Sequence, residues 1–380
     1  MRGKTPEQPS MLALVSIESM VPADHPLRGI RPLVQRVLHE LDPVFERMYT
    51  DWGRPSVPPE RLLKAMLLMS LYSVRSERQF CEQLGYNMLF RWFLDMDLTE
   101  RPFDASVFSK NRERLLEHDV ARHFFDAILE LDELRRHMSS DHFSVDGTLI
   151  EAWASAKSFR PKGEEESDNN GFADFKGTQR SNDTHESTTD PESRLFRKGR
   201  GREAKLSYMA HVLMENRNGL IQDFELTEAN GKAEREAALA MVDRERERRA
   251  RQRKKTRRKQ RKASQRTNQK GRRLTLAADK GYDTRDFVRA CRERRITPHV
   301  AQNQHVGRSS AIDNRTVHHP GYRVSSRARL LIEKIFGWAK TIGGYRRSRF
   351  RGRGRTRAAG LMVMSAFNLL RISKLTIKTT

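Results

Sequence analysis

The periodicity of apolar residues changes once along the chain, near residue 142, and this change limits the possible folds most. Residues 26–140 carry apolar side chains at helical spacing. From His142 onward, strand-like runs alternate with helical segments, and Asn218-Gly219 marks a tight hairpin. The expected strands begin at 142, 206, 219, 273 and 296, with helices at 234–245 and 284–295 and a long final helix. A mixed α/β core preceded by an all-helical region is therefore predicted.

Local signals divide the helical region further. A proline pair at 58–59 opens one helix, and Ser76 with Gln79 forms a capping box before a short helix that Gly85 ends. Another short helix follows at 87–94. Three short helices with a glycine turn are compatible with a DNA-binding bundle, although other small helical domains share this pattern.

The net charge of the chain is strongly positive. Lysines and arginines number 73 against 49 acidic residues, which gives a formal charge of +24. Contact with a polyanion such as nucleic acid is the role that favours this excess.

Much of the excess charge lies in two clusters. Residues 244–273 hold 17 lysines and arginines against two glutamates, a net charge of +15, and residues 346–357 hold seven arginines. A single basic run is a solvated segment about as often as it is a phosphate-binding one, but two such runs in one chain favour phosphate binding. Contacts with phosphates supply affinity without sequence information. The candidate DNA contacts in the second cluster are Arg346, Arg347 and Arg349.

Cysteine usage and hydropathy narrow the class of protein. Cys81 and Cys291 lie far apart, which argues against a disulfide scaffold, a cysteine-built zinc site and a CxxC redox centre. The longest charge-free apolar run, residues 358–370, is shorter than the roughly 18 residues of a membrane span. The first ten residues contain no apolar signal segment. We expect a soluble intracellular protein with no membrane partner.

Two aspartates lie in predicted strands, each close to a glycine. Asp146 precedes Gly147, and Asp279 ends its strand two residues before Gly281. Mixed sheets usually place ligands at the carboxyl ends of strands, so both aspartates are candidate site residues. Each one alone is more often a helix cap or a turn residue.

A third carboxylate, Glu333, lies between two cations in the predicted final helix. At 100° per residue, Arg329, Glu333 and Lys340 fall within about 40° of one another, beside an apolar stripe. Considered alone, such a row is more often an exposed set of ion pairs.

The three carboxylates as a set indicate more than each one does. Hard divalent cations bind oxygen ligands, and two such ions about 4 Å apart promote phosphodiester cleavage. Nucleic acid is also the partner that the charge predicts. The chain has neither a GxSxG nor a GxxxxGK[ST] motif, which argues against a serine hydrolase and a phosphate-binding loop.

Four segments carry a resemblance to a known family. They are VDGT at 145–148, ADKGYD at 278–283, Arg329-x3-Glu333-x6-Lys340 followed by GGYRRSR, and residues 54–87. In combination they resemble the DDE-type transposases of bacterial insertion sequences, in particular the insertion-sequence-five group. The similarity extends over nearly the whole chain.

The resemblance implies an RNase H-like catalytic core in which Asp146, Asp279 and Glu333 bind two Mg²⁺ ions. It also implies that Arg329 and Lys340 contact phosphates of the transposon end. Such enzymes cut DNA at the element's end, and the freed 3′-OH then attacks target DNA. A homodimer that pairs two DNA ends in the bacterial cytoplasm, at the nucleoid, is expected.

The related signature has a tyrosine three residues before the arginine. This chain has Ser326 at that position, and Tyr322 lies one helical turn earlier. A role that depends on the tyrosine is therefore not expected at position 326.

Three parts of the chain are expected on this basis. Residues 1–140 form a helical DNA-binding domain, 141–357 an RNase H-like catalytic domain, and 358–380 a C-terminal helix and tail. Within the catalytic domain, residues 160–200 are expected to be a surface loop and 244–273 a basic insertion.

Two alternatives remain open from the sequence. One is a catalytically silent DNA-binding protein, which would keep the basic segments. The other is a structure-specific nuclease with the same core. The terminal repeat, the target sequence, the route by which the second strand is cut and the activity of this copy do not follow from the residues.

Overall fold

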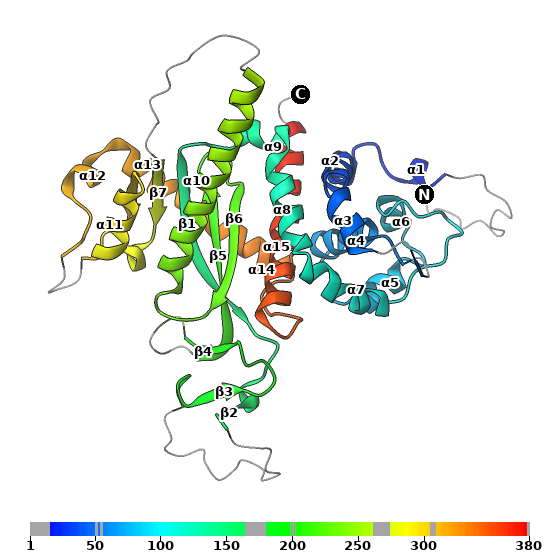
Figure 1. Cartoon of the computed structure of the whole chain (residues 1–380), viewed down its shortest axis with the longest axis horizontal. Coiled ribbons are helices and arrows are strands. Elements are labelled where there is room, and N and C mark those ends of the chain that lie inside the picture. Colours follow the sequence, from blue (N-terminus) through cyan, green and yellow to red (C-terminus); the bar gives the residue numbers. More distant parts are fainter. Residues whose placement is uncertain are drawn as a thin grey trace, which may run out of the picture.

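A computed structural model of the chain describes residues 16–49, 52–53, 56–163, 180–197, 199, 201, 203–260, 274–304 and 309–377. A mixed sheet stands at the centre of the molecule, with the N-terminal helices on one side (Figure 1). Its strands are β1 (His142–Glu151), β4 (Arg194–Phe196), β5 (Lys205–Glu215), β6 (Ile221–Glu228), β7 (Leu274–Ala278) and β8 (Ile296–Val300).

The strand order matches that of the RNase H fold. The order is β6-β5-β1-β7-β8, and β4 pairs with another part of β5. β5 runs antiparallel to β1 and β6, whereas β1, β7 and β8 are parallel. The predicted mixed α/β fold with an RNase H-like core is thus confirmed.

Helices cover both faces of the sheet. α10 (Ala233–Gln260) and α11 (Arg285–Glu293) enclose a core with Phe143 and Val145 of β1. The opposite face of the sheet contacts α13 (Pro320–Arg329), α14 (Leu331–Thr341) and α15 (Arg353–Ile377). A short helix, α12 (Asn314–His318), precedes α13. Because successive side chains of a strand alternate between faces, even-numbered β1 residues such as Asp146 point toward α13 and α14.

The N-terminal region is helical, as predicted. Its helices are α1 (Ile17–Met20), α2 (Pro26–Glu40), α3 (Asp42–Met48), α4 (Pro59–Leu71), α5 (Glu77–Gln83), α6 (Met88–Phe93), α7 (Ser106–Glu117), α8 (Val120–Glu130) and α9 (Asp132–His137). Ser76 Oγ accepts from the Gln79 N–H at 3.0 Å, so the predicted cap of α5 is present.

Helix α15 joins the helical region to the sheet. It packs against α2, α4 and α8 as well as β6, within one continuous apolar core. Residues 353–376 are long and apolar enough to cross a membrane, and this is the one such helix among the described residues. However, Leu361, Ala366 and Leu369 are fully buried against protein, as expected for a central core helix. The helix begins five residues before the predicted boundary at 358.

Two expectations about local structure need correction. The described parts of 160–200 are not only loop: β3 (His185–Ser187) pairs with β2 (Phe159–Pro161), and β4 extends the main sheet. The expected long final helix is divided at Leu330, whose N–H bonds to the Arg327 carbonyl at 3.2 Å. This tighter bond ends α13 and interrupts the regular α-helical pattern. Residues 164–179 lie outside the described part.

Candidate active site

Asp146 and Asp279 lie side by side at the end of the parallel strands. The β1–β7 register pairs Phe143 with Leu276 and Ser144 with Ala277. Continued for two residues beyond the paired part, the same offset brings Asp279 level with Asp146, and the charges of both aspartates act on the pKa of Tyr282. The two aspartates that the sequence singled out are therefore neighbours across the sheet.

Each aspartate is oriented by the glycine that follows it. The Gly147 N–H donates to Asp146 Oδ1 at 2.8 Å, and the Gly281 N–H donates to Asp279 Oδ1 at 2.8 Å. Asp146 Oδ2 lies 3.6 Å from the Arg329 guanidinium, which supplies positive charge at this position. Carboxylate oxygens are the ligands that a hard divalent ion prefers, and Arg329 occupies the side of Asp146 that such an ion would share.

Glu333 is not gathered with the two aspartates. It is exposed in the first turn of α14, directly after the break at Leu330. Across the described residues, no group of three or more His, Cys, Asp or Glu side chains is arranged to hold a metal ion. The structure thus brings together two of the three predicted ligands.

The two predicted phosphate-binding cations contact β1. Arg329, at the end of α13, forms its ion pair with Asp146. Lys340 Nζ donates to Thr148 Oγ1 at 2.6 Å. Arg329 and Lys340 come from different helices, but the two β1 residues that they contact, Asp146 and Thr148, are two positions apart on one face of the strand. Ser326 Oγ donates to the Tyr322 carbonyl, and the Tyr322 hydroxyl donates to the Val300 carbonyl, both at 2.9 Å.

The three arginines of the C-terminal cluster have different surroundings. Arg346 is exposed and forms no ion pair with any described residue. Arg347 donates to the Ala152 and Trp153 carbonyls at 3.2 and 3.0 Å. Both therefore lie beside the carboxyl end of β1.

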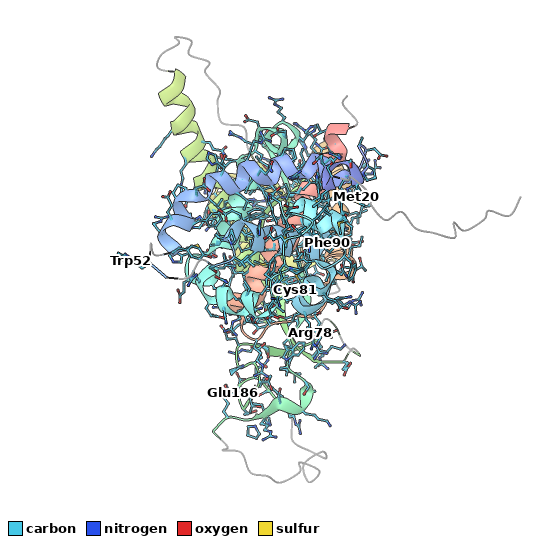
Figure 2. The ribbon with its side chains drawn as sticks, turned by 90° about the vertical axis from the view of Figure 1, so that its right-hand side faces the viewer. Met20, Trp52, Arg78, Cys81, Phe90 and Glu186 are labelled. Carbon is cyan, nitrogen blue, oxygen red and sulfur yellow. The ribbon has the colours of Figure 1, made fainter. Side chains whose placement is uncertain are left out.

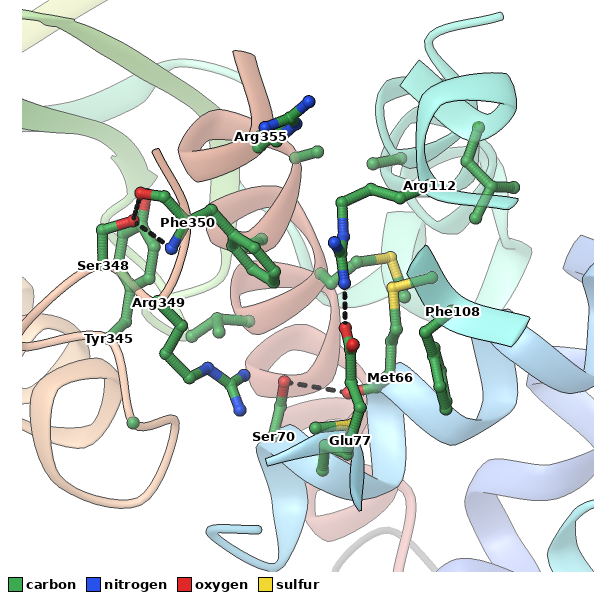
Figure 3. A pocket seen from close by; sticks show the side chains of 18 of the residues that line it. Met66, Ser70, Glu77, Phe108, Arg112, Tyr345, Ser348, Arg349, Phe350 and Arg355 are labelled. Carbon is green, nitrogen blue, oxygen red and sulfur yellow. Dashed lines mark hydrogen bonds and ion pairs between the residues drawn. The ribbon is translucent and has the colours of Figure 1, made fainter. Parts of the chain in front are cut away.

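Arg349 instead faces the N-terminal helices. Its guanidinium donates to the carbonyls of Val74 and Arg75, and it points into a cavity of about 80 Å³ between α15, α4, α5 and α7 (Figure 3). Phe350 follows it into the same cavity, under the Arg112 guanidinium at 4.7 Å. The geometry of Arg349 thus favours a role in holding the two regions together.

One carboxylate beside the aspartates was missed by the sequence reasoning. Glu234, in the first turn of α10, lies over Gly147: a Cβ there would be 2.9 Å from Glu234 Oε1. Burial raises the pKa of Tyr282 well above its usual value, and the charges of Glu234, Asp146 and Asp279 add to this effect. The Tyr282 hydroxyl has no hydrogen-bond partner among the described residues. The only sequence signal for Glu234 was Gly147, because a glycine permits another side chain to approach the backbone closely.

His211 completes the surroundings of Gly147. It is fully buried opposite Gly147 in the register of β1 and β5, and burial lowers its pKa to about 3. Its Nε2 lies 2.8 Å from Thr227 Oγ1, while its Nδ1 would be 3.2 Å from a Cβ at position 147. A neutral imidazole is therefore expected beside β1 across the physiological pH range.

Gly147→Ala should disturb this part of the site. The added methyl would press on both Glu234 and His211, so we expect a loss of about 1–3 kcal/mol in stability. A displacement of Asp146, a predicted site residue, by about 1 Å should slow the predicted phosphodiester cleavage up to about 100-fold. Urea unfolding and a DNA cleavage assay measure the two effects. Gly337→Ala in α14 is the control, because nothing lies within 4 Å of its Cβ position; equal effects of both changes would contradict this account.

Comparison with known families gives a clear match over most of the chain. The model described as "Transposase DDE domain" matches residues 139–369, and "Transposase domain (DUF772)" matches residues 15–114. The chain belongs to the DDE transposase family. The predicted DDE family and enzyme class are thus confirmed: the protein is a DDE-type transposase of the insertion-sequence kind that acts on DNA. Membership of the insertion-sequence-five group stays a prediction.

Solved structures of Mos1 transposase are weakly similar to this transposase. A pre-cleavage Mos1 transpososome is 12% identical, over 85% of this chain and 82% of that chain, with a TM-score of 0.20. A Mos1 mariner paired-end complex with Mn is 12% identical over 93% of each chain, also with a TM-score of 0.20. Similarity at this level does not define a common fold, and the RNase H-like fold is assigned from the strand order. No curated protein matches the chain.

Proposed function

We propose that this transposase cuts and joins DNA at the ends of its own insertion sequence, with Asp146, Asp279 and Glu333 as its catalytic carboxylates. The observation that carries the proposal is the adjacency of Asp146 and Asp279 across β1 and β7, within a DDE transposase domain. Glu333 is the nearest match to the third acid of the family motif, and we propose that it joins the pair when DNA is bound.

The family implies divalent metal use, and we propose two Mg²⁺ ions. Bound ions of this kind activate water and stabilise the leaving oxygen of a phosphodiester. In this chain, Asp146 and Asp279 would hold them, each fixed by a glycine N–H. Arg329 now occupies the cationic position beside Asp146, and we propose that it turns to a DNA phosphate when the ions neutralise the aspartate.

Partners and location follow from the same proposal. The DNA partners are the two transposon ends and the target, and a homodimer would bring the two ends together. The enzyme would act in the bacterial cytoplasm, at the nucleoid.

We propose DNA binding for the basic residues 244–273 as well, but part of this charge is used inside the fold. Arg244 contacts Asp223 and Glu225 at 2.7 and 3.0 Å, and Arg248 and Arg249 both pair with the buried Glu245. Residues 244–260 continue α10, so the basic segment begins as a helix. Residues 261–273 lie outside the described part.

The decisive experiment separates joining from cutting. Purified protein is incubated in Mg²⁺ with a DNA duplex that carries the terminal repeat found beside its own coding sequence, and with a supercoiled target plasmid. Joined products with the 3′ end of the element in the plasmid support the proposal. Nicked duplex without joining indicates a nuclease, and binding without cleavage indicates a silent DNA-binding protein.

Lys340→Ala should weaken contact with the DNA end without weakening metal binding. A lysine that contacts one phosphate contributes about one unit of the salt dependence, so the slope of log affinity against log salt should fall by about 0.9. End cleavage should slow about 10-fold. Lys334→Ala, an exposed lysine on the same helix, is the control. Normal end binding with weaker Mn²⁺ binding, measured by titration calorimetry, would contradict the phosphate role.

A further inference from the structure

Trp153 lies two residues beyond the end of β1 and is held out in solvent. It is 47% exposed, whereas its neighbours Ala152 and Ala154 are 1% and 7% exposed. The backbone on both sides is thus anchored in the protein, and the indole ring projects from a fixed position. A large aromatic ring kept in water forgoes the favourable free energy of burial, which points to a binding role.

Arg347 fixes this position from the C-terminal segment. Its Nε and Nη2 donate to the Ala152 and Trp153 carbonyls, and its guanidinium lies 5.8 Å from the centre of the Trp153 ring. The backbone reinforces the contact: the Glu151 N–H donates to the Arg346 carbonyl, and the Ser348 N–H donates to the Glu151 carbonyl. Ring and guanidinium are therefore presented together.

Trp153 ends a row of cations along β1. Arg329 contacts Asp146, Lys340 contacts Thr148, and Arg347 contacts the carbonyl of Ala152. The exposed Arg346 lies next to the last of these. A row of positive side chains that leads to an exposed aromatic ring is the arrangement with which proteins bind a single DNA strand: cations contact the phosphates and the ring stacks on a base.

The length of the row fits a short stretch of DNA. Asp146 and Ala152 are six residues apart, which corresponds to about 20 Å of strand. At about 3.4 Å per nucleotide of a stacked DNA strand, this distance spans about six nucleotides, and fewer when the strand is extended. The base at Trp153 would thus lie within about six nucleotides of the scissile phosphate.

We infer that Trp153, supported by Arg347, is a stacking platform for one unpaired base of the DNA strand whose scissile phosphate lies at Asp146 and Asp279. The inference rests on the proposed function, and it adds a specific residue that positions the DNA end. Unpairing near the cleavage point exposes the face of a base, and the indole provides the matching surface.

A cycle of protein and DNA changes tests the inference. The probe is a duplex with the element's terminal repeat and flank, in which one nucleotide at a time, up to six on either side of the cut, is made abasic. Affinity is measured in EDTA, so that no cleavage occurs. Trp153→Ala should bind the intact duplex about 10-fold more weakly, within the range of stacking on one base. At one position only, removal of the base should weaken binding by wild type about 10-fold as well. At that position it should not weaken binding by Trp153→Ala any further.

Two variants separate stacking from general effects. Trp153→Phe retains an aromatic face and should bind within about threefold of wild type. Trp52→Ala is the comparison, because Trp52 is also exposed, at 90%, but projects from the N-terminal region, away from β1 (Figure 2). Any loss of affinity in Trp52→Ala should be the same on the intact duplex and on every abasic duplex.

Three outcomes would overturn the inference. Equal binding by Trp153→Ala and wild type, with normal cleavage of the duplex by wild type in Mg²⁺, would contradict the stacking role and leave the proposed function intact. A second contradiction would be that, at every position, the affinity lost through Trp153→Ala and the affinity lost through the abasic site multiply. The two changes would then act independently, so no base would stack on Trp153. Failure of wild type itself to bind or cut the duplex would overturn the proposed function together with the platform.

Discussion

Asp146→Asn and Asp279→Asn should each reduce cleavage of the element's end by about 10³-fold or more, since each removes one negative charge from the proposed cation site. The amide has nearly the shape of the carboxylate and still accepts the N–H of the following glycine. Folding and DNA binding should therefore remain. Cleavage of a labelled end duplex in Mg²⁺ gives the rate, and a gel-shift assay in EDTA gives the binding.

Asp286→Asn provides the matched control for these changes. Asp286 lies on α11, is exposed, and pairs only with Arg289 in the described structure. Asp286→Asn removes one negative charge, as the two site variants do, but at a position away from the end of β1. A similar loss of cleavage in all three variants would mean that net charge, and not the site, determines the rate.

The third carboxylate is tested by comparing Glu333→Gln with Glu234→Gln. The family motif favours Glu333, whereas Glu234 lies over Gly147, the residue next to Asp146, and acts on the same Tyr282 as the two aspartates. We expect Glu333→Gln to be as inactive as the aspartate variants and Glu234→Gln to retain measurable cleavage. Normal cleavage by Glu333→Gln together with an inactive Glu234→Gln would show that the motif assigns the wrong acid.

Elements set by local chemistry were predictable from the sequence. Ser76 caps α5 and Asn87 caps α6, because a short polar side chain satisfies a backbone N–H at a helix start. Gly219 has a φ of +72° in the hairpin between β5 and β6, as the Asn-Gly pair indicated. In each of these cases the signal and the structure lie within a few residues of one another.

Features that depend on distant partners were not predictable in the same way. The adjacency of Asp146 and Asp279 requires two strands about 130 residues apart to pair in one register, and no local pattern fixes that register. β4 has only three residues and exists because β5 offers a free edge there. Glu234 was indicated only indirectly, since a glycine shows that something comes close without showing what it is.

The charge distribution shows the same limit. A count of arginines predicted a DNA-binding surface, but several of them neutralise buried acids. Asp223 is the central example: its side chain is 1% exposed and accepts from Arg122 of α8 at 2.6 Å and from Arg244 of α10 at 2.7 Å. This group joins the helical region, the sheet and the basic helix at a single carboxylate.

Asp223→Ala should therefore destabilise the protein by about 3–5 kcal/mol, the usual cost of breaking a buried ion pair. Burial by itself lowers the pKa of Arg122, and Asp223 and Asp126 raise it above the usual value in the intact protein. An arginine side chain stays protonated in proteins, so the guanidinium remains charged in the variant. A charged side chain that is only 14% exposed would then lose its buried partner. Equilibrium urea unfolding measures the loss.

Asp126→Ala is the control for this prediction, because Asp126 pairs with the same arginine at 2.9 Å but is 42% exposed. Water replaces an exposed partner readily, and such pairs contribute about 0–1 kcal/mol. If the two variants were equally stable, the junction at Asp223 would depend on apolar packing around α8 and β6 rather than on its ion pairs. A large difference would show that part of the positive charge stabilises the fold and is not available to DNA.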